Sequence, residues 1–176
     1  ALFLLFLGFE AAVAVSQPDV GKLPPLRDGD LVFQTTLDFQ AMATMMASNT
    51  FYTHVGIIKT QGHAPPLVVE VGPVRETPLQ QFIDRGMGKR LAIARVKSLR
   101  PEQAAKALAW AKTQYGKPYD LYFMPDTKSF YCSELVRDSF KEGAGVTLGR
   151  YQKVGDLAHS AAMDKIIEER WPMYPL

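Results

Sequence analysis

The sequence predicts an α+β domain in which helices pack on an antiparallel sheet. Its 176 residues fit one domain, and a chain of this length buries roughly 70% of its unfolded surface without disulfides or structural zinc. Predicted strands cluster early in the chain, and two of them are close enough to form a hairpin. Predicted helices lie on both sides of this group of strands, which is the order of elements in an α+β domain.

The composition excludes several classes of protein. With 47% hydrophobic and 22% charged residues, the chain is not mostly disordered. It has 20 basic and 18 acidic residues and no Lys/Arg run longer than two, so we expect no nucleic-acid partner. The single cysteine, Cys132, excludes an internal disulfide and a cysteine-rich metal site. Because the acids and histidines lack ligand spacing such as HExxH, we expect no metal and no organic cofactor.

The first sixteen residues form an apolar segment whose only charge is Glu10. They are too few to cross a bilayer core, which takes about 20 residues. An apolar block followed by small residues at 12–16 is typical of a secretory signal peptide and its cleavage site. We therefore expect residues 1–16 to derive from a signal peptide, residues 17–176 to form a single domain, and the protein to be periplasmic or in the cell envelope. A buried N-terminal helix or an expression remnant is the alternative.

Strands are predicted where short apolar runs lie between turn residues. A loop rich in Pro and Gly (17–29) comes first. The turn at 61–66 joins two predicted strands into a hairpin. The predicted strands cover 31–33, 55–58, 67–71 and 91–96.

Helices are predicted where apolar residues recur at helical spacing. Pro101 opens the clearest one and Gly116 ends it, while Gly86 ends a shorter one. The predicted helices cover 37–48, 79–85, 101–116, 130–142 and 155–170. The first contains Met42, Met45 and Met46, which we assign to the core, with an adaptable acyl-chain site as the alternative.

The cysteine falls at the predicted start of a helix. With Ser129 as the N-cap, Cys132 occupies the third helical position. The free backbone N–H groups and the positive end of the helix dipole there favour a thiolate and can hold an oxyanion. This position indicates a nucleophile. The alternative is a small buried apolar residue, the usual role of a free cysteine.

A cysteine nucleophile needs a base, usually a histidine oriented by a third polar group. His63 lies in a predicted turn and His159 in the last predicted helix, where solvated positions are expected. His54 instead stands at the start of a strand. Glu70 interrupts an apolar strand, and the hairpin would bring it near the level of His54, where a carboxylate could fix the imidazole tautomer. The alternative for Glu70 is a solvent-facing position.

Several short motifs together resemble the papain-like hydrolases of the NlpC class. They are GDLVF (29–33), THVGI (53–57), VVEVG (68–72), GKPYD (116–120) and FYCSELV (130–136). In common members the cysteine helix comes before the GDLVF and HVGI strands, whereas here it comes after them. The order is similar to that of the circularly permuted branch, and a Glu as the third member favours its YiiX-like group. The resemblance spans about residues 28–149.

The resemblance implies a papain-like fold, with a small antiparallel sheet packed on the helix that bears the nucleophile. It implies Cys132 as nucleophile, His54 as base and Glu70 as the third member. Tyr119 and Tyr131 stand near the matched motifs and are candidates for substrate contact, with packing as the alternative.

The implied activity is hydrolysis of an amide bond through a thioester. Relatives of the NlpC class cut cell-wall peptides, and the permuted branch is similar to enzymes that handle acyl chains and lipids, so both substrate classes and a peripheral membrane contact are open. One alternative is a lipid-binding protein with an inactive triad. The other is an acyltransferase anchored through residues 1–16.

Overall fold

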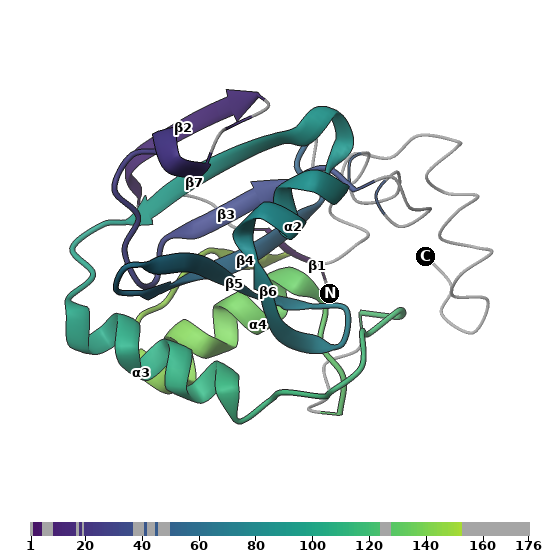
Figure 1. The fold of residues 1–176 in the computed structure, drawn as a ribbon. Coiled ribbons are helices and arrows are strands. Elements are labelled where there is room, and N and C mark those ends of the chain that lie inside the picture. The colour runs from purple at the N-terminus through teal and green to yellow at the C-terminus, as the bar shows by residue number, and fades with distance from the viewer. Residues whose placement is uncertain are drawn as a thin grey trace.

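The computed structural model describes residues 2–4, 9–16, 18, 20–36, 41, 45, 50–123 and 128–152. Within these residues the chain builds a six-stranded sheet in which every neighbouring pair is antiparallel (Figure 1). A second pair, β1 (Leu2–Leu4) and β8 (Arg150–Gln152), joins the two ends of the described chain. In spatial order the larger sheet runs β2 (Phe9–Ser16), β7 (Arg90–Val96), β3 (Leu31–Gln34), β4 (His54–Gln61), β5 (Ala64–Val71) and β6 (Val74–Pro78).

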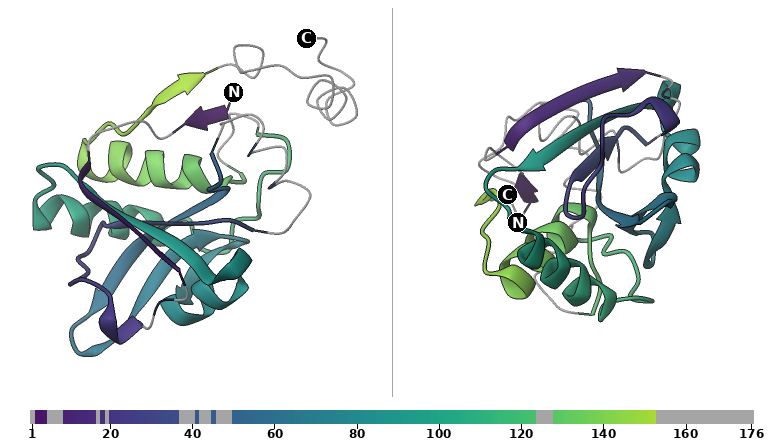
Figure 2. Two further views of the ribbon diagram at one scale, coloured as in Figure 1. Left: turned by 90° about the horizontal axis from the view of Figure 1, so that it is seen from above. Right: turned by 60° about the vertical axis from the view of Figure 1, so that its left-hand side comes forward.

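Helices cover both faces of the sheet (Figures 1 and 2). α2 (Leu79–Arg85) packs on one face, and α3 (Pro101–Lys112) and α4 (Cys132–Asp138) pack on the other. α4 continues directly into a π-helical turn, η3 (Ser139–Gly143), against which α3 packs. The structure also describes two short 3-10 turns, η1 (Val20–Lys22) and η2 (Met87–Lys89).

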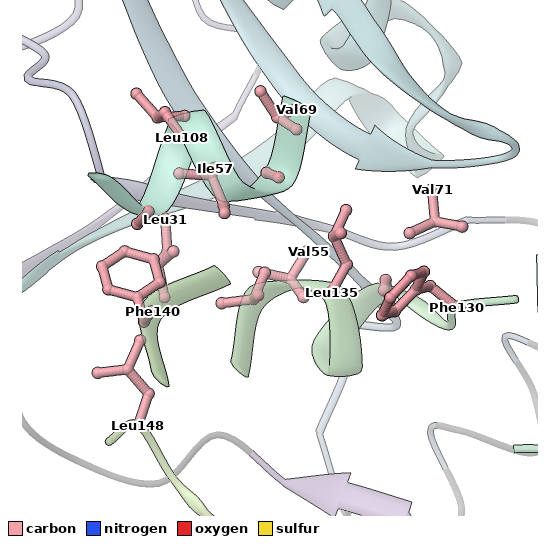
Figure 3. Close-up of a cluster of buried hydrophobic side chains, with 14 of the residues drawn as sticks. Leu31, Val55, Ile57, Val69, Val71, Leu108, Phe130, Leu135, Phe140 and Leu148 are labelled. Atoms are coloured by element: carbon pink, nitrogen blue, oxygen red, sulfur yellow. The ribbon is translucent and has the colours of Figure 1, made fainter. Parts of the chain in front are cut away.

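The larger apolar core lies between the sheet and the pair α3–α4. Alternate residues of β4 and β5 enter it, because successive side chains of a strand point to opposite faces. Figure 3 shows Phe130 and Val71 at one end of this core, and Phe140 and Leu148 at the other. Its other large buried members include Leu31, Val55, Ile57, Val69, Leu108 and Leu135. The core fixes α4, and with it Cys132, against the middle strands.

The intervening residues of the same strands form a second core under α2. Ile58 and Val68 are fully buried there against Phe82 and Ile83 of that helix. Both faces of β4 and β5 are thus covered, so a polar side chain on either strand must find its partners inside the protein.

The GDLVF segment is anchored by its aspartate. Asp30 is 2% exposed, and both of its carboxylate oxygens bond to Arg95 of β7, at 2.8 and 2.7 Å. Gly29 just before it has φ +83°, and a Cβ there would lie 2.7 Å from Leu99 Cδ2, so the turn requires glycine. These contacts set where β3 starts.

Most predicted elements are confirmed, with shifted ends. α2 has the predicted bounds, and the four predicted strands are present, each extended by one to three residues at an end. α3 ends at Lys112, four residues before Gly116. β6 was not predicted, and neither was β2, so a buried N-terminal helix is wrong for residues 9–16.

Two predicted helices fall mainly or wholly outside the described residues. Within 37–48 only Ala41 and Met45 are described, and both are helical, whereas Met42 and Met46 are outside. The helix predicted at 155–170 is also outside. In the part of the chain that the structure describes, no helix is long and apolar enough to cross a bilayer.

Candidate active site

Cys132 is the first residue of α4, which corrects the predicted cap. The residue before the helix is Tyr131, extended at φ −96° and ψ 163°, and its side chain makes no capping bond. Ser129 is therefore not the N-cap, and Cys132 stands at the first helical position instead of the third. The thiol still lies in the first turn, where backbone N–H groups lack intrahelical acceptors.

The helix starts late because the chain before it is held extended. Phe130 forms a parallel bridge with Tyr119, and its N–H donates to the Pro118 carbonyl at 3.1 Å. The Asp120 N–H donates to the Phe130 carbonyl at 2.9 Å. These bonds tie the GKPYD segment to the cysteine segment and delay the helical turn by two residues.

His54 is the first residue of β4 and lies beside the thiol. The imidazole is 9% exposed, and the neighbouring Cys132 side chain raises its pKa. Cys132 Sγ also lies 3.9 Å from the Thr53 carbonyl oxygen. The chain therefore brings together two side chains that are 78 positions apart, one from the sheet and one from the helix.

Glu70 of β5 accepts a hydrogen bond from the other side of the histidine ring. His54 Nε2 and Glu70 Oε2 are 2.8 Å apart, and the carboxylate is 1% exposed. A solvent-facing position for Glu70 is therefore wrong. Because Nε2 is engaged with Glu70, Nδ1 is the ring nitrogen that remains for the thiol.

Three further side chains surround the Glu70 carboxylate. Thr77 Oγ1 donates to Oε1 at 2.5 Å, and Arg85 Nη2 donates to Oε2. Arg75, the cross-strand partner of Glu70 on β6, has its Nε 3.9 Å from Oε1. The buried negative charge is thus compensated on both oxygens.

An aromatic ring from α2 packs against the histidine. The rings of Phe82 and His54 have centroids 5.8 Å apart and are inclined by 29°. The Arg85 guanidinium lies over the same Phe82 ring, 5.0 Å from its centroid. The imidazole is therefore held by a ring on one face of the sheet and by hydrogen-bonding groups at its edges.

These contacts shift the pKa values of both partners. Burial alone would lower the pKa of His54, but the hydrogen bonds and charges of Cys132 and Glu70 outweigh it and raise that pKa to about 9. Burial would raise the pKa of Glu70, but its bonds to His54, Arg85 and Thr77 and the charge of His54 lower it to about 2. At neutral pH the site therefore favours an imidazolium facing a carboxylate.

The two tyrosines predicted near substrate lie in different environments. Tyr131 is 2% exposed, and Phe123 packs edge-on against it with ring centroids 4.9 Å apart. Tyr119 is half-buried and packs at the margin of the larger core. His63 is exposed in the hairpin turn as expected, and His159 lies outside the described residues.

Thr77 and Arg85 were not predicted as site residues. Thr77 and Arg85 reach Glu70 from elements that only tertiary packing brings together. Local periodicity carries no signal for such contacts. The only usable signal was burial: an acid predicted inside an apolar strand requires cationic or hydroxyl donors from its neighbours.

The family model described as "Permuted papain-like amidase enzyme, YaeF/YiiX, C92 family" matches residues 25–171. The chain is 34% identical over 168 residues to "Uncharacterized protein YiiX" of Escherichia coli (strain K12), covering 94% of this chain and 82% of that protein. It is also similar to a crystal structure described as "metalloprotein yiiX from Escherichia coli O157:H7, DUF1105". That match has a TM-score of 0.77 and 33% identity, and covers 82% of each chain.

Proposed function

The chain belongs to the family of permuted papain-like amidases and is a cysteine hydrolase, and from that premise we propose which residues carry the reaction. Cys132 is the nucleophile, His54 is the general base and acid, and Glu70 orients His54. The observation that supports this assignment is a continuous series of contacts from Cys132 to His54 to Glu70, contributed by α4, β4 and β5. A thiol, an imidazole and an orienting carboxylate in series are the parts that nucleophilic catalysis requires.

The reaction then proceeds through a thioester. The Cys132 thiolate attacks the carbonyl carbon of the substrate, and a C–S bond forms as the carbonyl electrons move to oxygen. When the tetrahedral intermediate collapses, the C–N bond breaks and His54 gives its proton to the leaving amine. Water attacks the thioester carbon while His54 takes up its proton, so that a C–O bond forms. The C–S bond then breaks, which releases the acid product and restores the Cys132 thiolate beside the protonated His54. The backbone N–H of Cys132, at the first helical position, is placed to stabilise the oxyanion.

Two substrate classes are proposed, a cell-wall peptide and an acyl amide. Exposed apolar side chains support the second class and a peripheral membrane contact. Phe51 is 74% exposed and stands three residues before His54, and Leu121 and Tyr122 are more than half exposed just after the GKPYD segment. Exposed apolar side chains of this size are common where a protein takes up an apolar ligand.

Hydrolysis by the wild-type protein and by Cys132→Ala tests the proposal. Both proteins are assayed against a muropeptide and a long-chain N-acyl amide, with circular dichroism to confirm folding. We expect the wild type to cleave one of the two and Cys132→Ala to lose all turnover. Equal turnover by the folded variant would overturn the proposal. Tight binding of the acyl compound without cleavage by the wild type would favour the lipid-binding alternative, and transfer of the acyl group to an added amine would favour the acyltransferase.

We also propose export to the periplasm or cell envelope, from the apolar segment at 1–16. Residues 9–16 pair with β7 as strand β2, so cleavage after Ser16 would remove the strand at that edge of the sheet. Mass spectrometry of the N-terminus of protein recovered from the envelope fraction tests both export and cleavage.

The similar crystal structure is described as that of a metalloprotein. In the described part of this chain, no three His, Cys, Asp or Glu side chains gather in a way that could hold a metal ion. At the proposed site, both oxygens of Glu70 already accept bonds from Thr77, His54 and Arg85. The donor set at this site therefore does not fit a metal, and the steps above use only groups of the chain itself.

A further inference from the structure

One oxygen of Glu70 serves two donors. Glu70 Oε2 accepts from His54 Nε2 at 2.8 Å and also from Arg85 Nη2, while Oε1 accepts from Thr77. The guanidinium and the imidazolium therefore share one oxygen of a buried carboxylate, and they compete for its negative charge. Hydrogen bonds between charged groups are the strong ones, so this competition changes how firmly Glu70 holds His54.

Arg85 is itself fixed in place from two sides. Gln34, which is fully buried at the end of β3, accepts from Arg85 Nε at 3.1 Å and donates to the Phe82 carbonyl at 2.6 Å in the amide orientation that satisfies both groups. The guanidinium also lies over the Phe82 ring. A residue that served only as a surface counter-charge would not need a buried amide to direct it.

We propose that Arg85 is a positioning residue of the reaction, which shares Glu70 Oε2 with His54 and so limits how tightly the carboxylate retains the histidine proton. The inference rests on the proposed triad. His54 must release a proton to the leaving amine and then recover one from water. A carboxylate that bonded to His54 alone would stabilise the protonated imidazole strongly. A carboxylate that also bonds to Arg85 stabilises it less, so His54 gives up its proton more readily.

In the described part of the chain, the titratable and charged groups around the His54–Glu70 pair come from three further elements. Cys132 on α4 acts on His54, and Arg75 on β6 and Arg85 on α2 face Glu70. Arg75 offers a matched control, because it also faces Glu70 but at 3.9 Å, on the other oxygen and with 52% of its side chain exposed. If any positive charge near Glu70 had this effect on His54, substitution of Arg75 and substitution of Arg85 would shift the pKa of His54 equally.

The test is an NMR titration of the His54 ring in the full-length protein and its variants. Arg85→Gln removes the competing cation, and we expect the pKa of His54 to rise by about one pH unit. Arg75→Gln should leave it within about 0.3 units because that side chain is solvated and more distant. Arg85→Lys keeps a cation and should restore most of the wild-type value. In turnover, Arg85→Gln should lower kcat with little change in KM.

Gln34→Met keeps the inference testable if Arg85→Gln does not fold. It removes the acceptor that directs Arg85, and the pKa of His54 should rise in the same direction by a smaller amount. An unchanged or lowered His54 pKa in the folded variant, or equal shifts for Arg75→Gln and Arg85→Gln, would overturn the inference. Failure of the proposed function would be seen separately, in the hydrolysis assay of Cys132→Ala. Full hydrolysis by that variant would overturn the proposed catalytic triad, whatever the Arg85 variants show.

Discussion

At the scale of single residues, the site depends on a carboxylate that is almost completely buried. Glu70 is 1% exposed on a strand covered on both faces, and an isolated charge in such a place would be strongly destabilising. His54, Thr77 and Arg85 compensate for it by donating to its two oxygens. Catalytic orientation and stability therefore depend on the same contacts.

Glu70→Gln should change the pH dependence of stability. The pKa of Glu70 is lowered to about 2, so its contribution is complete above about 4.5 and is lost as the pH falls toward 2. The pKa of His54 is raised to about 9, so its contribution is complete below about 6.5 and is lost as the pH rises toward 9. Both are complete between those limits, where Glu70→Gln should cost on the order of 3 kcal/mol.

Thermal unfolding followed by circular dichroism across the pH range measures this effect. The gap in Tm between wild type and Glu70→Gln should be widest near about pH 5.5 and narrower above about pH 9. Glu76→Gln is the control, because Glu76 is only partly buried and pairs with Lys59, away from the histidine. A gap that stays constant with pH would mean that His54 and Glu70 are not coupled.

The residues with reactive chemistry could be predicted from the sequence, and those that support them could not. Cys132, His54 and Glu70 each sit in a distinctive local pattern: a helix start, a strand start and an acid inside an apolar strand. Thr77 and Arg85 lie in no distinctive sequence pattern. They matter because β6 and α2 bring them to one carboxylate, and that information is tertiary.

At the scale of elements, the glycine of the THVGI motif sets how closely β4 approaches β5. A Cβ on Gly56 would lie 2.3 Å from Val68 Cγ1, 3.0 Å from the Val69 carbonyl oxygen and 3.4 Å from Glu70 Cβ. The first separation is shorter than real Cβ contacts, and the second is tighter than most of them. The glycine thus permits the strand spacing at which Glu70 reaches His54.

Gly56→Ala should force these strands apart and destabilise the protein by about 1–3 kcal/mol, the usual effect of an overpacked core. It should also slow Cys132 alkylation near neutral pH, because Glu70 shifts with its strand. Chemical denaturation and an alkylation assay measure the two effects. Gly72→Ala is the matched control, since a Cβ there meets only the Arg75 guanidinium at 3.7 Å or more. Equal stability of the two variants would refute this account of Gly56.

Elements were predictable where one local signal dominated. α2 lies between Pro78 and Gly86, and the apolar runs of β3, β4, β5 and β7 mark covered strands. The start of α4 was misplaced because bonds from Pro118 and Asp120 hold the preceding chain extended, and these are contacts between separate segments. β6 was missed because Arg75 and Thr77 face Glu70 and Glu76 pairs with Lys59, which leaves no apolar alternation.

At the scale of the whole molecule, His54 is contacted by groups from both faces of the sheet. The helices α3 and α4 pack on one face, and α4 carries Cys132. The helix α2 packs on the other face and carries Phe82 and Arg85. The first residue of β4 lies where both groups can reach it. The strands of the larger sheet all precede α4 in the chain. This is the order that the motifs predicted, and it agrees with the description of the matching family as permuted.

The rate at which iodoacetamide alkylates Cys132, followed from about pH 5 to pH 9, tests the central claim most directly. The shape of this profile reports the thiolate population independently of how accessible the sulfur is. If His54 and Glu70 activate the thiol, the rate for the wild type should depend less on pH than the rate for His54→Gln, which should rise about tenfold with each unit of pH up to about pH 8, as for an ordinary thiol. Identical, steadily rising profiles for the two proteins would contradict the account.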